Sequence, residues 1–335
     1  MATHFFGITD RTFAYSFSIG RNEFGGTGFR NPVGLAVGDN ETIYVANRSY
    51  ENRPDGVRIT VCTYNEDFIG EFGSAGEGDG QFVWPSDIAV DSDGKVYVSD
   101  EYLHRITIFD KDGNYLSKWG KQGSGEGEFT GPASLAMTGD GHVLVTDAKN
   151  HRIQKYTLDG QFVAQCGSYG DGPGQFNMPW GVNVDADGNM YVADWRNDRI
   201  QKLSPEGESL AVYGTSGSGV GQFNHPSDVC VDLDGDLYIA DRENNRVQIL
   251  APDGRFLAEL LGDHQISKWG KEKLQSNPDM IRQRALAIAH DRGEFEKRFC
   301  NPCAVWVDAQ HRILVLDHVR GRIQVYTKSD TPVLA

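Results

Sequence analysis

The sequence predicts an all-β protein with one domain, a six-bladed β-propeller that spans residues 1–335. Three observations predict this fold. A unit of roughly 47 residues recurs along the chain, and a period of that length is typical of solenoids and propellers. Each unit contains four short β-rich runs, which is the make-up of a propeller blade. The last unit lacks its fourth run, and a matching run is present near the N-terminus.

Each unit begins with the motif Phe-x-x-Pro. The motif occurs at Phe29–Pro32, Phe82–Pro85, Phe129–Pro132, Phe176–Pro179, Phe223–Pro226 and Phe299–Pro302. Between one motif and the next, β-rich runs alternate with turns that carry Asp-Gly, and the apolar residues do not follow helical spacing. We therefore expect six blades, each with strands A to D in chain order.

The N-terminal segment is expected to complete the last blade. Residues 12–20, Thr-Phe-Ala-Tyr-Ser-Phe-Ser-Ile-Gly, read like the strand D segments of the complete units. Gly20 precedes Phe29 by nine residues. Gly73 and Phe82, which belong to a complete unit, have the same spacing. Pairing of this segment with the last unit would remove the unpaired edge that an open array of blades presents.

An Arg opens strand C of every unit. These residues are Arg58, Arg105, Arg152, Arg199, Arg246 and Arg322. Five residues earlier, five of the units have an Asp: Asp100, Asp147, Asp194, Asp241 and Asp317. The first unit has Asn47, displaced by a longer loop. Because these residues recur in nearly every unit, we expect them to form ion pairs that hold the blades together, not a binding site.

Two of the units resemble NHL repeats. They are residues 190–202, Met-Tyr-Val-Ala-Asp-Trp-Arg-Asn-Asp-Arg-Ile-Gln-Lys, and the corresponding residues 237–250. The resemblance extends over essentially the whole chain, and it implies a propeller with a central channel lined by the A strands. It does not fix a function, because propellers carry many functions.

The loops that differ between units are expected to form a site at one mouth of the channel. The B–C loops and the D–A connections lie on the same face, since strands alternate in direction. Residues in these loops differ from blade to blade and are free to bind a ligand. The expected ligand-binding residues are Arg48, Trp180, Trp195, Arg196 and Arg242. Arg binds anions in a bidentate manner, so a small polar anion is the expected ligand. The alternative is a solvated collar of loops without a ligand.

Four residues are candidates for catalysis: Asp87, Tyr102, Asp228 and His318. Asp87 and Asp228 have equivalent positions in the second and fifth units, which face each other across a ring of six. They are expected to act as a base or to hold a divalent cation in the central channel, because hard cations prefer oxygen ligands. Tyr102 or His318 would act as the acid. In the alternative interpretation, each Asp only caps its own strand.

A second resemblance concerns the six-bladed propeller lyase that cleaves peptidyl-hydroxyglycine. Tyr102 and Arg242 match its Tyr two residues, and its Arg one residue, after a strand B Asp. Its structural cation is bound by an Asp two residues after the Pro, which Asp87 and Asp228 resemble. Its zinc-binding histidines directly follow that Pro. At those positions this chain has Val33, Ser86, Ala133, Trp180, Ser227 and Cys303, so the zinc site is not implied.

An insertion separates the fifth and sixth units. Phe299 follows Gly262 by 37 positions, where the usual spacing is nine. The inserted residues 263–298 contain helix-compatible runs, among them 279–290 after a Pro at a plausible helix start. A helical insertion beside a channel mouth suggests a lid. A packing element or a dimer contact is the alternative.

Charge and cysteine content exclude several classes of partner. The formal charge is −15 and the pI is near 5.0, which argues against nucleic acid and anionic membranes as partners. The sequence shows neither a secretory signal pattern nor an apolar run of about 20 residues that could cross a membrane. Five cysteines fit a reducing compartment. We therefore expect a cytoplasmic protein.

The predicted function is binding of a small polar ligand at the channel mouth. If the chain is an enzyme, the expected classes are a lyase or a hydrolase that acts on a small anionic substrate. The alternative is a scaffold without catalysis that uses the same face to bind a protein partner. Sequence alone leaves enzymatic activity open, and the predicted partners are therefore a small molecule or a protein.

Overall fold

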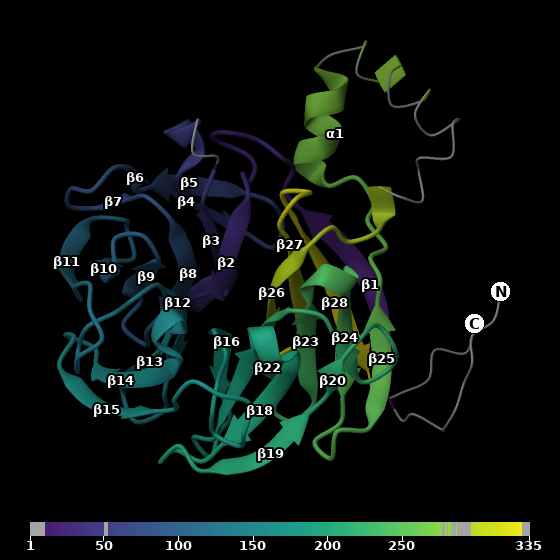
Figure 1. Ribbon diagram of the computed structural model, residues 1–335. Coiled ribbons are helices and arrows are strands. Elements are labelled where there is room, and N and C mark those ends of the chain that lie inside the picture. The colour runs from purple at the N-terminus through teal and green to yellow at the C-terminus, as the bar shows by residue number, and fades with distance from the viewer. Residues whose placement is uncertain are drawn as a thin grey trace.

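The computed structural model is a ring of six four-stranded antiparallel sheets around a central channel, as Figure 1 shows. It describes residues 11–49, 53–276 and 296–329, together with Asp279, Ile281, Arg282 and Leu286. The predicted fold, a six-bladed β-propeller, is confirmed. Strand A of each blade lies nearest the channel and begins at the Pro of the repeated motif, so the motif positions the channel wall.

The blades follow one another along the chain. Blade 1 contains β2 (Pro32–Val37), β3 (Thr42–Asn47), β4 (Arg58–Thr63) and β5 (Phe68–Phe72), and blade 2 contains β8 (Pro85–Val90), β9 (Val96–Asp100), β10 (Arg105–Phe109) and β11 (Tyr115–Trp119). Blade 3 contains β12 (Pro132–Met137), β13 (His142–Asp147), β14 (Arg152–Thr157) and β15 (Phe162–Cys166), and blade 4 contains β16 (Pro179–Val184), β17 (Met190–Asp194), β18 (Arg199–Leu203) and β19 (Ser209–Tyr213). Blade 5 contains β22 (Pro226–Val231), β23 (Leu237–Asp241), β24 (Arg246–Leu250) and β25 (Phe256–Leu260), and blade 6 contains β26 (Pro302–Val307), β27 (Arg312–Asp317), β28 (Arg322–Ser329) and β1 (Thr12–Ile19).

Short elements connect the blades. Two parallel pairs lie in the D–A connections: β6 (Ser74–Ala75) with β7 (Gln81–Phe82), and β20 (Thr215–Ser216) with β21 (Gln222–Phe223). Five 3₁₀ turns are described: η1 (Asp39–Glu41), η2 (Pro54–Gly56), η3 (Ala148–Asn150), η4 (Trp195–Asn197) and η5 (Arg242–Asn244). All except η1 lie in B–C loops, on the same side of the ring as the D–A connections.

The N-terminal strand closes the ring, as predicted. β1 pairs antiparallel with β28, from Thr12 opposite Ser329 to Ile19 opposite Ile323. A bulge between Tyr15 and Phe17 shifts the register. Strand D of blade 6 therefore comes from the first residues of the chain, and strands A to C come from the last.

The Phe of the repeated motif explains why a Gly stands nine residues before it. Phe82 is fully buried between blades 1 and 2. Gly73 has a φ of 74°, and a Cβ there would lie 2.5 Å from a ring atom of Phe82. The chain therefore needs a glycine where strand D turns over the Phe ring. The same arrangement joins Gly20 to Phe29, at the seam that the N-terminal strand closes.

The expected ion pair between the strand B Asp and the strand C Arg forms in four blades. Its N–O distances are 2.9 Å for Arg152 with Asp147, 2.8 Å for Arg199 with Asp194, 2.8 Å for Arg246 with Asp241 and 2.9 Å for Arg322 with Asp317. Each of these Arg side chains also donates to carbonyls of the preceding connection, as Arg152 does to Gly125 and Glu128.

Blades 1 and 2 depart from the expected pair. Arg58 has Asn47 in place of the Asp, and it pairs at 2.9 Å with Glu71 of its own strand D. Arg105 donates to the carbonyls of Glu77, Gly78 and Gln81, while Asp100 accepts backbone N–H groups. The predicted pair was therefore wrong for blade 2, because carbonyl acceptors satisfy Arg105; in blade 1, where Asn47 replaces the Asp, Glu71 provides the carboxylate.

Part of the insertion is a helix that packs at the outer edge of blades 1 and 6. This helix, α1 (Lys268–Gln275), extends away from the ring in Figure 1. Its Trp269 is buried, with ring centroids 6.0 Å from Phe29 and 6.5 Å from Phe68. The predicted helix 279–290 lies largely outside the described residues, so the role of a lid stays a prediction. None of the described helices is long and apolar enough to cross a membrane.

Glu66 binds the N-terminal end of this helix. It occupies the C–D turn position that is glycine in blades 2 to 5 (Gly113, Gly160, Gly207 and Gly254), and its φ is 58°. Its buried carboxylate accepts a 2.7 Å bond from the Gly20 N–H and a bond from the Lys268 N–H. Burial raises the pKa of this carboxyl, and the backbone donors oppose that shift. One departure from the repeat therefore positions α1.

Candidate ligand-binding site at the channel mouth

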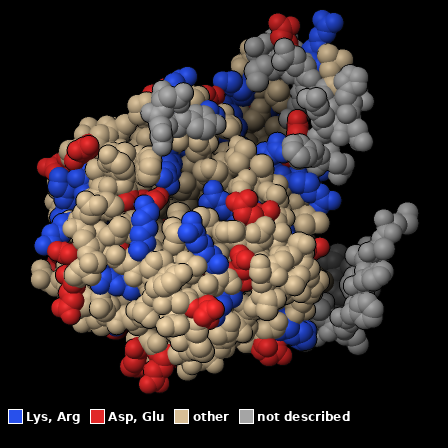
Figure 2. Space-filling model, in the orientation of Figure 1, with Lys and Arg blue, Asp and Glu red and all other residues tan. Residues whose placement is uncertain are grey.

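A cavity of about 810 Å³ opens on the face formed by the B–C loops and the D–A connections. Figure 2 shows this face hollowed near its centre, with Lys and Arg side chains beside the hollow. The predicted residues that line the cavity are Arg48, Trp180, Trp195, Arg196, Arg242 and His318. They come from blades 1, 4, 5 and 6, so the ring brings together loop residues that lie far apart in the sequence.

The B–C loops of blades 4 and 5 hold their first residue at the mouth by the same local structure. Each strand B ends in an Asp, a 3₁₀ turn follows, and a left-handed residue ends the turn: Asp198 with φ 52° and Asn245 with φ 54°. In blade 5, the Asn244 amide donates at 2.9 Å to Asp241 and at 2.9 Å to Gly217 of the preceding connection. The first residue of each turn, Trp195 or Arg242, therefore lines the channel.

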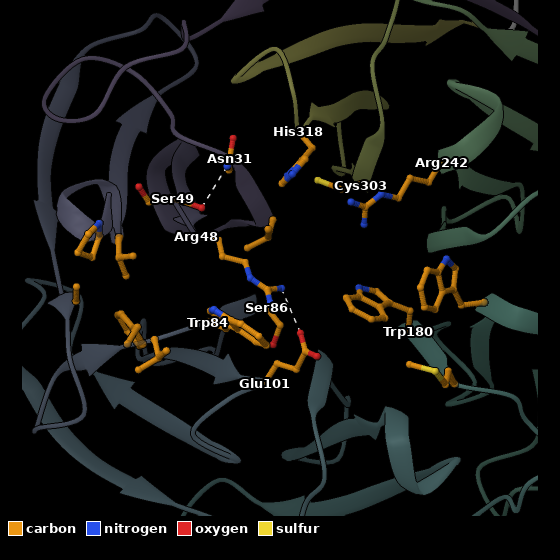
Figure 3. A pocket seen from close by; sticks show the side chains of 18 of the residues that line it. Asn31, Arg48, Ser49, Trp84, Ser86, Glu101, Trp180, Arg242, Cys303 and His318 are labelled. Atoms are coloured by element: carbon orange, nitrogen blue, oxygen red, sulfur yellow. Dashed lines mark hydrogen bonds and ion pairs between the residues drawn. The ribbon is translucent and has the colours of Figure 1, made fainter. Parts of the chain in front are cut away.

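Arg242 is a cation without a counter-charge. Figure 3 shows its guanidinium pointing into the cavity. Its Nε is buried and has no hydrogen-bond partner, and no ion pair forms at this guanidinium within the part of the chain that the structure describes. Glu243, the next residue, accepts a 3.3 Å bond from Asn301 instead. The Nε atoms of Arg21 and Arg105 also have no partner, but those guanidinium groups donate through their Nη atoms. Arg242 differs because no described residue pairs with any of its guanidinium nitrogens, so an acceptor from a ligand would complete it.

Arg48, on the opposite side of the cavity, is already paired. Its Nη1 lies 3.2 Å from Glu101 Oε2, and its guanidinium lies 4.6 Å from the centroid of Trp84. Lys149 contacts the other oxygen of Glu101 at 3.1 Å. Figure 3 shows the pair of Arg48 and Glu101 beside Trp84. This carboxylate therefore provides Arg48 and Lys149 with a shared counter-charge on this side of the mouth.

Two indole rings lie beside Arg242. The centroids of Trp180 and Trp195 are 5.3 Å apart with planes inclined at 58°, and His225 packs edge-on to Trp195 at 5.0 Å. The Trp195 Nε1 atom is buried and lacks a hydrogen-bond acceptor among the described residues. Arg196 is exposed, and its guanidinium is 5.8 Å from the Trp195 centroid.

His318 is a neutral imidazole with a defined tautomer. Its Nδ1 lies 2.9 Å from the Pro32 carbonyl oxygen, which can only accept, so Nδ1 carries the proton and Nε2 does not. Burial lowers the pKa of His318 to about 4; the bond to Pro32 opposes this shift, and the positive charges of Arg242 and Arg48 contribute to it. At neutral pH the ring is therefore neutral, and its bare Nε2 can accept a proton; the expected role as an acid stays a prediction.

Cys303 shares this environment and is not a nucleophile. Its Sγ lies 3.2 Å from the same Pro32 carbonyl, and burial raises the pKa of the thiol to about 12. At neutral pH it is a protonated, weakly polar wall of the cavity.

Asp87 and Asp228 lie deeper in the channel, apart from the mouth residues. Both line a narrowing below the mouth and a second cavity of about 190 Å³ beyond it. Asp87 Oδ2 accepts a 2.7 Å bond from Ser134 and a 3.0 Å bond from the Leu135 N–H, and Asp228 Oδ2 accepts a 2.9 Å bond from the Val305 N–H. Each carboxylate therefore joins its strand A to strand A of the next blade.

Burial raises the pKa of both channel carboxyls. The pKa of Asp87 rises to about 6, and that of Asp228 rises well above its usual value, with the Asp87 charge contributing to the second shift. The two are near enough to each other to interact, and their oxygens are of the type that binds a divalent cation. A channel cation held by this pair stays a prediction.

A second acidic group, Asp232 with Asp234, already surrounds the Lys328 ammonium at 2.6 Å from each carboxylate.

Tyr102 lies at the rim and does not line the cavity. It is 51% exposed, and its ring packs against Trp84 at 5.4 Å. Arg242 belongs to blade 5, whereas Tyr102 belongs to blade 2. The ring therefore does not bring together the Tyr and Arg that match the motif of the propeller lyase that cleaves peptidyl-hydroxyglycine.

The sequence analysis missed lining residues that directly precede the motif Pro. Asn31, Trp84 and Met178 line the cavity from these positions. Asn31 and Met178 have φ values of 44° and 55°. The available signal was that the residue before the Pro differs in most blades, like the loop residues that were selected.

Two family models match parts of the chain. One, described as a 6-bladed beta-propeller, matches residues 85–164, and one for the NHL repeat matches residues 176–203 and 223–250. The matched NHL segments contain Trp195 and Arg242, so the resemblance stated from the sequence is confirmed there. No curated protein matches the sequence.

Several solved structures are similar in fold. A protein of unknown function from Bacteroides thetaiotaomicron aligns with a TM-score of 0.64 and 19% identity, over 95% of this chain and 76% of that one. A catalytically inactive virginiamycin B lyase from Staphylococcus aureus, solved with quinupristin, aligns with a TM-score of 0.56 and 12% identity, over 94% and 99% of the two chains. A streptogramin B lyase structure aligns with a TM-score of 0.56 and 12% identity, over 95% and 98%. At these identities the similarity concerns the fold alone.

Proposed function

The chain is a six-bladed β-propeller built of NHL repeats, and from that premise we propose that it binds a small anionic ligand in the cavity at the channel mouth. The observation that carries this proposal is the unpaired guanidinium of Arg242, which faces the cavity with a buried Nε. The repeated parts of the blades maintain the ring, so the loop residues that do not repeat are the ones available for a ligand.

The energetics of Arg242 favour an anion with two acceptor atoms. A carboxylate or a phosphate forms two parallel charge-assisted hydrogen bonds with a guanidinium. It would satisfy Nε, which no described residue does. The cavity of about 810 Å³ lies within the usual range for small-molecule sites, about 300–1,000 Å³.

A lyase reaction is a second candidate, favoured by His318. Its bare Nε2 and the Arg242 guanidinium face the same cavity. In an elimination, the neutral imidazole would take the proton from the carbon next to the bound carboxylate, and the electrons of that C–H bond would form a C=C bond. The leaving group on the adjacent carbon would depart with its bonding electrons, while the Arg stabilises the negative charge on the carboxylate. The structural similarity to virginiamycin B lyase and streptogramin B lyase is in accord with this candidate, at the level of the fold. Tyr102, which lies outside the cavity, would not take part.

A scaffold that binds a protein partner through the same face is the competing function, and the NHL repeats are in accord with it. The two functions predict different behaviour of Arg242. A ligand site needs this guanidinium to bind small anions, whereas a scaffold needs it only for capture of the partner.

The test measures binding of small anions to the purified protein. Acetate, succinate, citrate, benzoate and inorganic phosphate are titrated by calorimetry and by thermal shift, with the wild type, Arg242→Gln and the control Arg255→Gln. Arg255 is exposed, in a C–D turn on the opposite face. We expect at least one anion to bind and Arg242→Gln to weaken it by about tenfold or more, with no change in the control. Equal binding by both variants, or no binding by the wild type, would overturn the proposal.

A further inference from the structure

We infer that the ligand is a hydroxylated aromatic carboxylate, with its carboxylate on Arg242 and its ring against Trp180 and Trp195. This inference rests on the proposed function and specifies the class of anion. Three residues that line the cavity have a nitrogen without a described hydrogen-bond partner: the donors Arg242 and Trp195, at Nε1, and the acceptor His318, at Nε2. Together with the indole faces, these groups define the chemistry expected of the ligand.

The aromatic part of the inference comes from the position of the two indoles. Figure 3 shows Trp180 inside the cavity, on the side of Arg242. The inclined Trp180–Trp195 pair presents π surface to the cavity, and an aromatic ring packs against such surface in an offset or edge-on geometry. An anion held by Arg242 therefore has a flat apolar group as its best neighbour.

The opposite side of the cavity does not offer an equivalent place. The face of Trp84 is covered by Arg48 at 4.6 Å, and Arg48 is neutralised by Glu101. Tyr102 packs against another part of the same indole. A ligand ring that approached Trp84 would have to displace the guanidinium from it. The indoles beside Arg242 are therefore the favoured platform.

The hydroxyl group follows from the remaining donor and acceptor. Trp195 Nε1 is a buried N–H that can only donate, and His318 Nε2 can only accept, since its Nδ1 proton is bound to Pro32. A hydroxyl group both donates and accepts, so it can bond with a group of either kind. A ligand without a polar substituent would forgo these bonds and would cover His318 Nε2 without replacing its water, which costs affinity.

The test compares ligands that differ by one feature. Benzoate, 4-hydroxybenzoate, 3-hydroxybenzoate, cyclohexanecarboxylate and acetate are titrated into wild-type protein by calorimetry. Cyclohexanecarboxylate has the charge and nearly the size of benzoate but no π system. We expect a hydroxybenzoate to bind about tenfold or more tightly than cyclohexanecarboxylate, and more tightly than benzoate.

Variants identify the groups responsible. Trp180→Leu removes π surface and should weaken hydroxybenzoate about fivefold while it leaves cyclohexanecarboxylate unchanged. Trp195→Phe keeps a ring but removes the N–H, and should reduce the preference for hydroxybenzoate over benzoate. Trp306→Phe is the control, because Trp306 lines the lower cavity. Thermal unfolding confirms that each variant is folded.

Three outcomes are possible. Dependence of hydroxybenzoate binding on Trp180 and Trp195 supports the inference. Equal binding of cyclohexanecarboxylate, insensitive to Trp180→Leu but still dependent on Arg242, overturns the aromatic class and leaves the proposed anion site in place. Binding of these acids that is independent of Arg242 overturns both.

Discussion

The two halves of the channel mouth differ in how their charges are satisfied. On the blade 1 to 3 half, Arg48 and Lys149 share the carboxylate of Glu101, and Trp84 is covered by Arg48. On the blade 4 to 6 half, Arg242 has no described counter-charge. The comparison shows that an Arg at a channel mouth is not evidence of a site by itself. The informative feature is an Arg that the protein leaves unpaired.

The largest expected effect is a difference in stability between variants of a structural Arg and a variant of the Arg that lines the cavity. Arg152 is buried in an ion pair with Asp147 at 2.9 Å. Arg152→Gln should lower the free energy of unfolding by about 3–5 kcal/mol, because it leaves a buried carboxylate unpaired. Arg242→Gln should change it by less than about 0.5 kcal/mol. Urea unfolding of both variants measures the difference, and equal destabilisation would show that Arg242 has a structural role.

The next largest expected effect is the contribution of His318 to the pH dependence of the unfolding free energy. Its folded pKa of about 4 lies below the ordinary value of about 6.5, so its contribution to stability is complete above about pH 6.5 and is lost as the pH falls toward 4. The loss is at most about 3 kcal/mol. His318→Asn, which keeps a donor for Pro32 and does not titrate, should flatten the fall in unfolding free energy between about pH 7 and about pH 4.5.

Asp87 provides a control for the pH experiment, because its contribution to stability changes with pH in the opposite direction. Its folded pKa of about 6 lies above its ordinary value, so its contribution to stability is present below about pH 4 and is lost as the pH rises through 6. Asp87→Asn should therefore make stability fall more steeply toward acid, whereas His318→Asn makes it fall less. The same slope in both variants would contradict the assigned protonation states.

The smallest expected effect comes from a substitution that makes the two halves of the channel mouth alike. Glu101→Gln removes the counter-charge of Arg48 and Lys149. Stability should fall by less than about 1 kcal/mol, as for partly exposed ion pairs. Affinity for small carboxylates should rise about threefold, because the freed guanidinium attracts anions. Calorimetry measures the affinity, with Glu206→Gln on the opposite face as the control. An unchanged affinity would show that pairing does not decide which half binds.

Much of the fold could be read from the sequence because repetition encodes it. The spacing of Gly20 and Phe29 matched that of Gly73 and Phe82, and this local steric relation predicted the strand that closes the ring. The same repetition assigned the loops to one face, since strand direction follows from strand count. Local relations within a unit of the chain are visible in a sequence.

The ion pairing, protonation and depth of each site residue were not predictable from the sequence, because they depend on contacts between blades. Arg48 belongs to blade 1 and its partner Glu101 to blade 2, so no local pattern shows their pairing. The Pro32 carbonyl that fixes the His318 proton is 286 residues away in the sequence. The depth of Asp87 in the channel follows from where strand A lies in the ring, and this separated it from the mouth.

Closure by β1 has a consequence for biosynthesis. Thr12 contacts Ser329, 317 positions later, so β1 leaves the ribosome long before its partner β28 has been made. Blades 1 to 5 are each contiguous in sequence and can form in order during translation. Blade 6 cannot, and until β28 has been made the nascent chain exposes the apolar face of blade 1 that packs against blade 6, together with an unpaired β1. Truncation near the C-terminus would therefore leave the segment at the beginning of the chain without its partner.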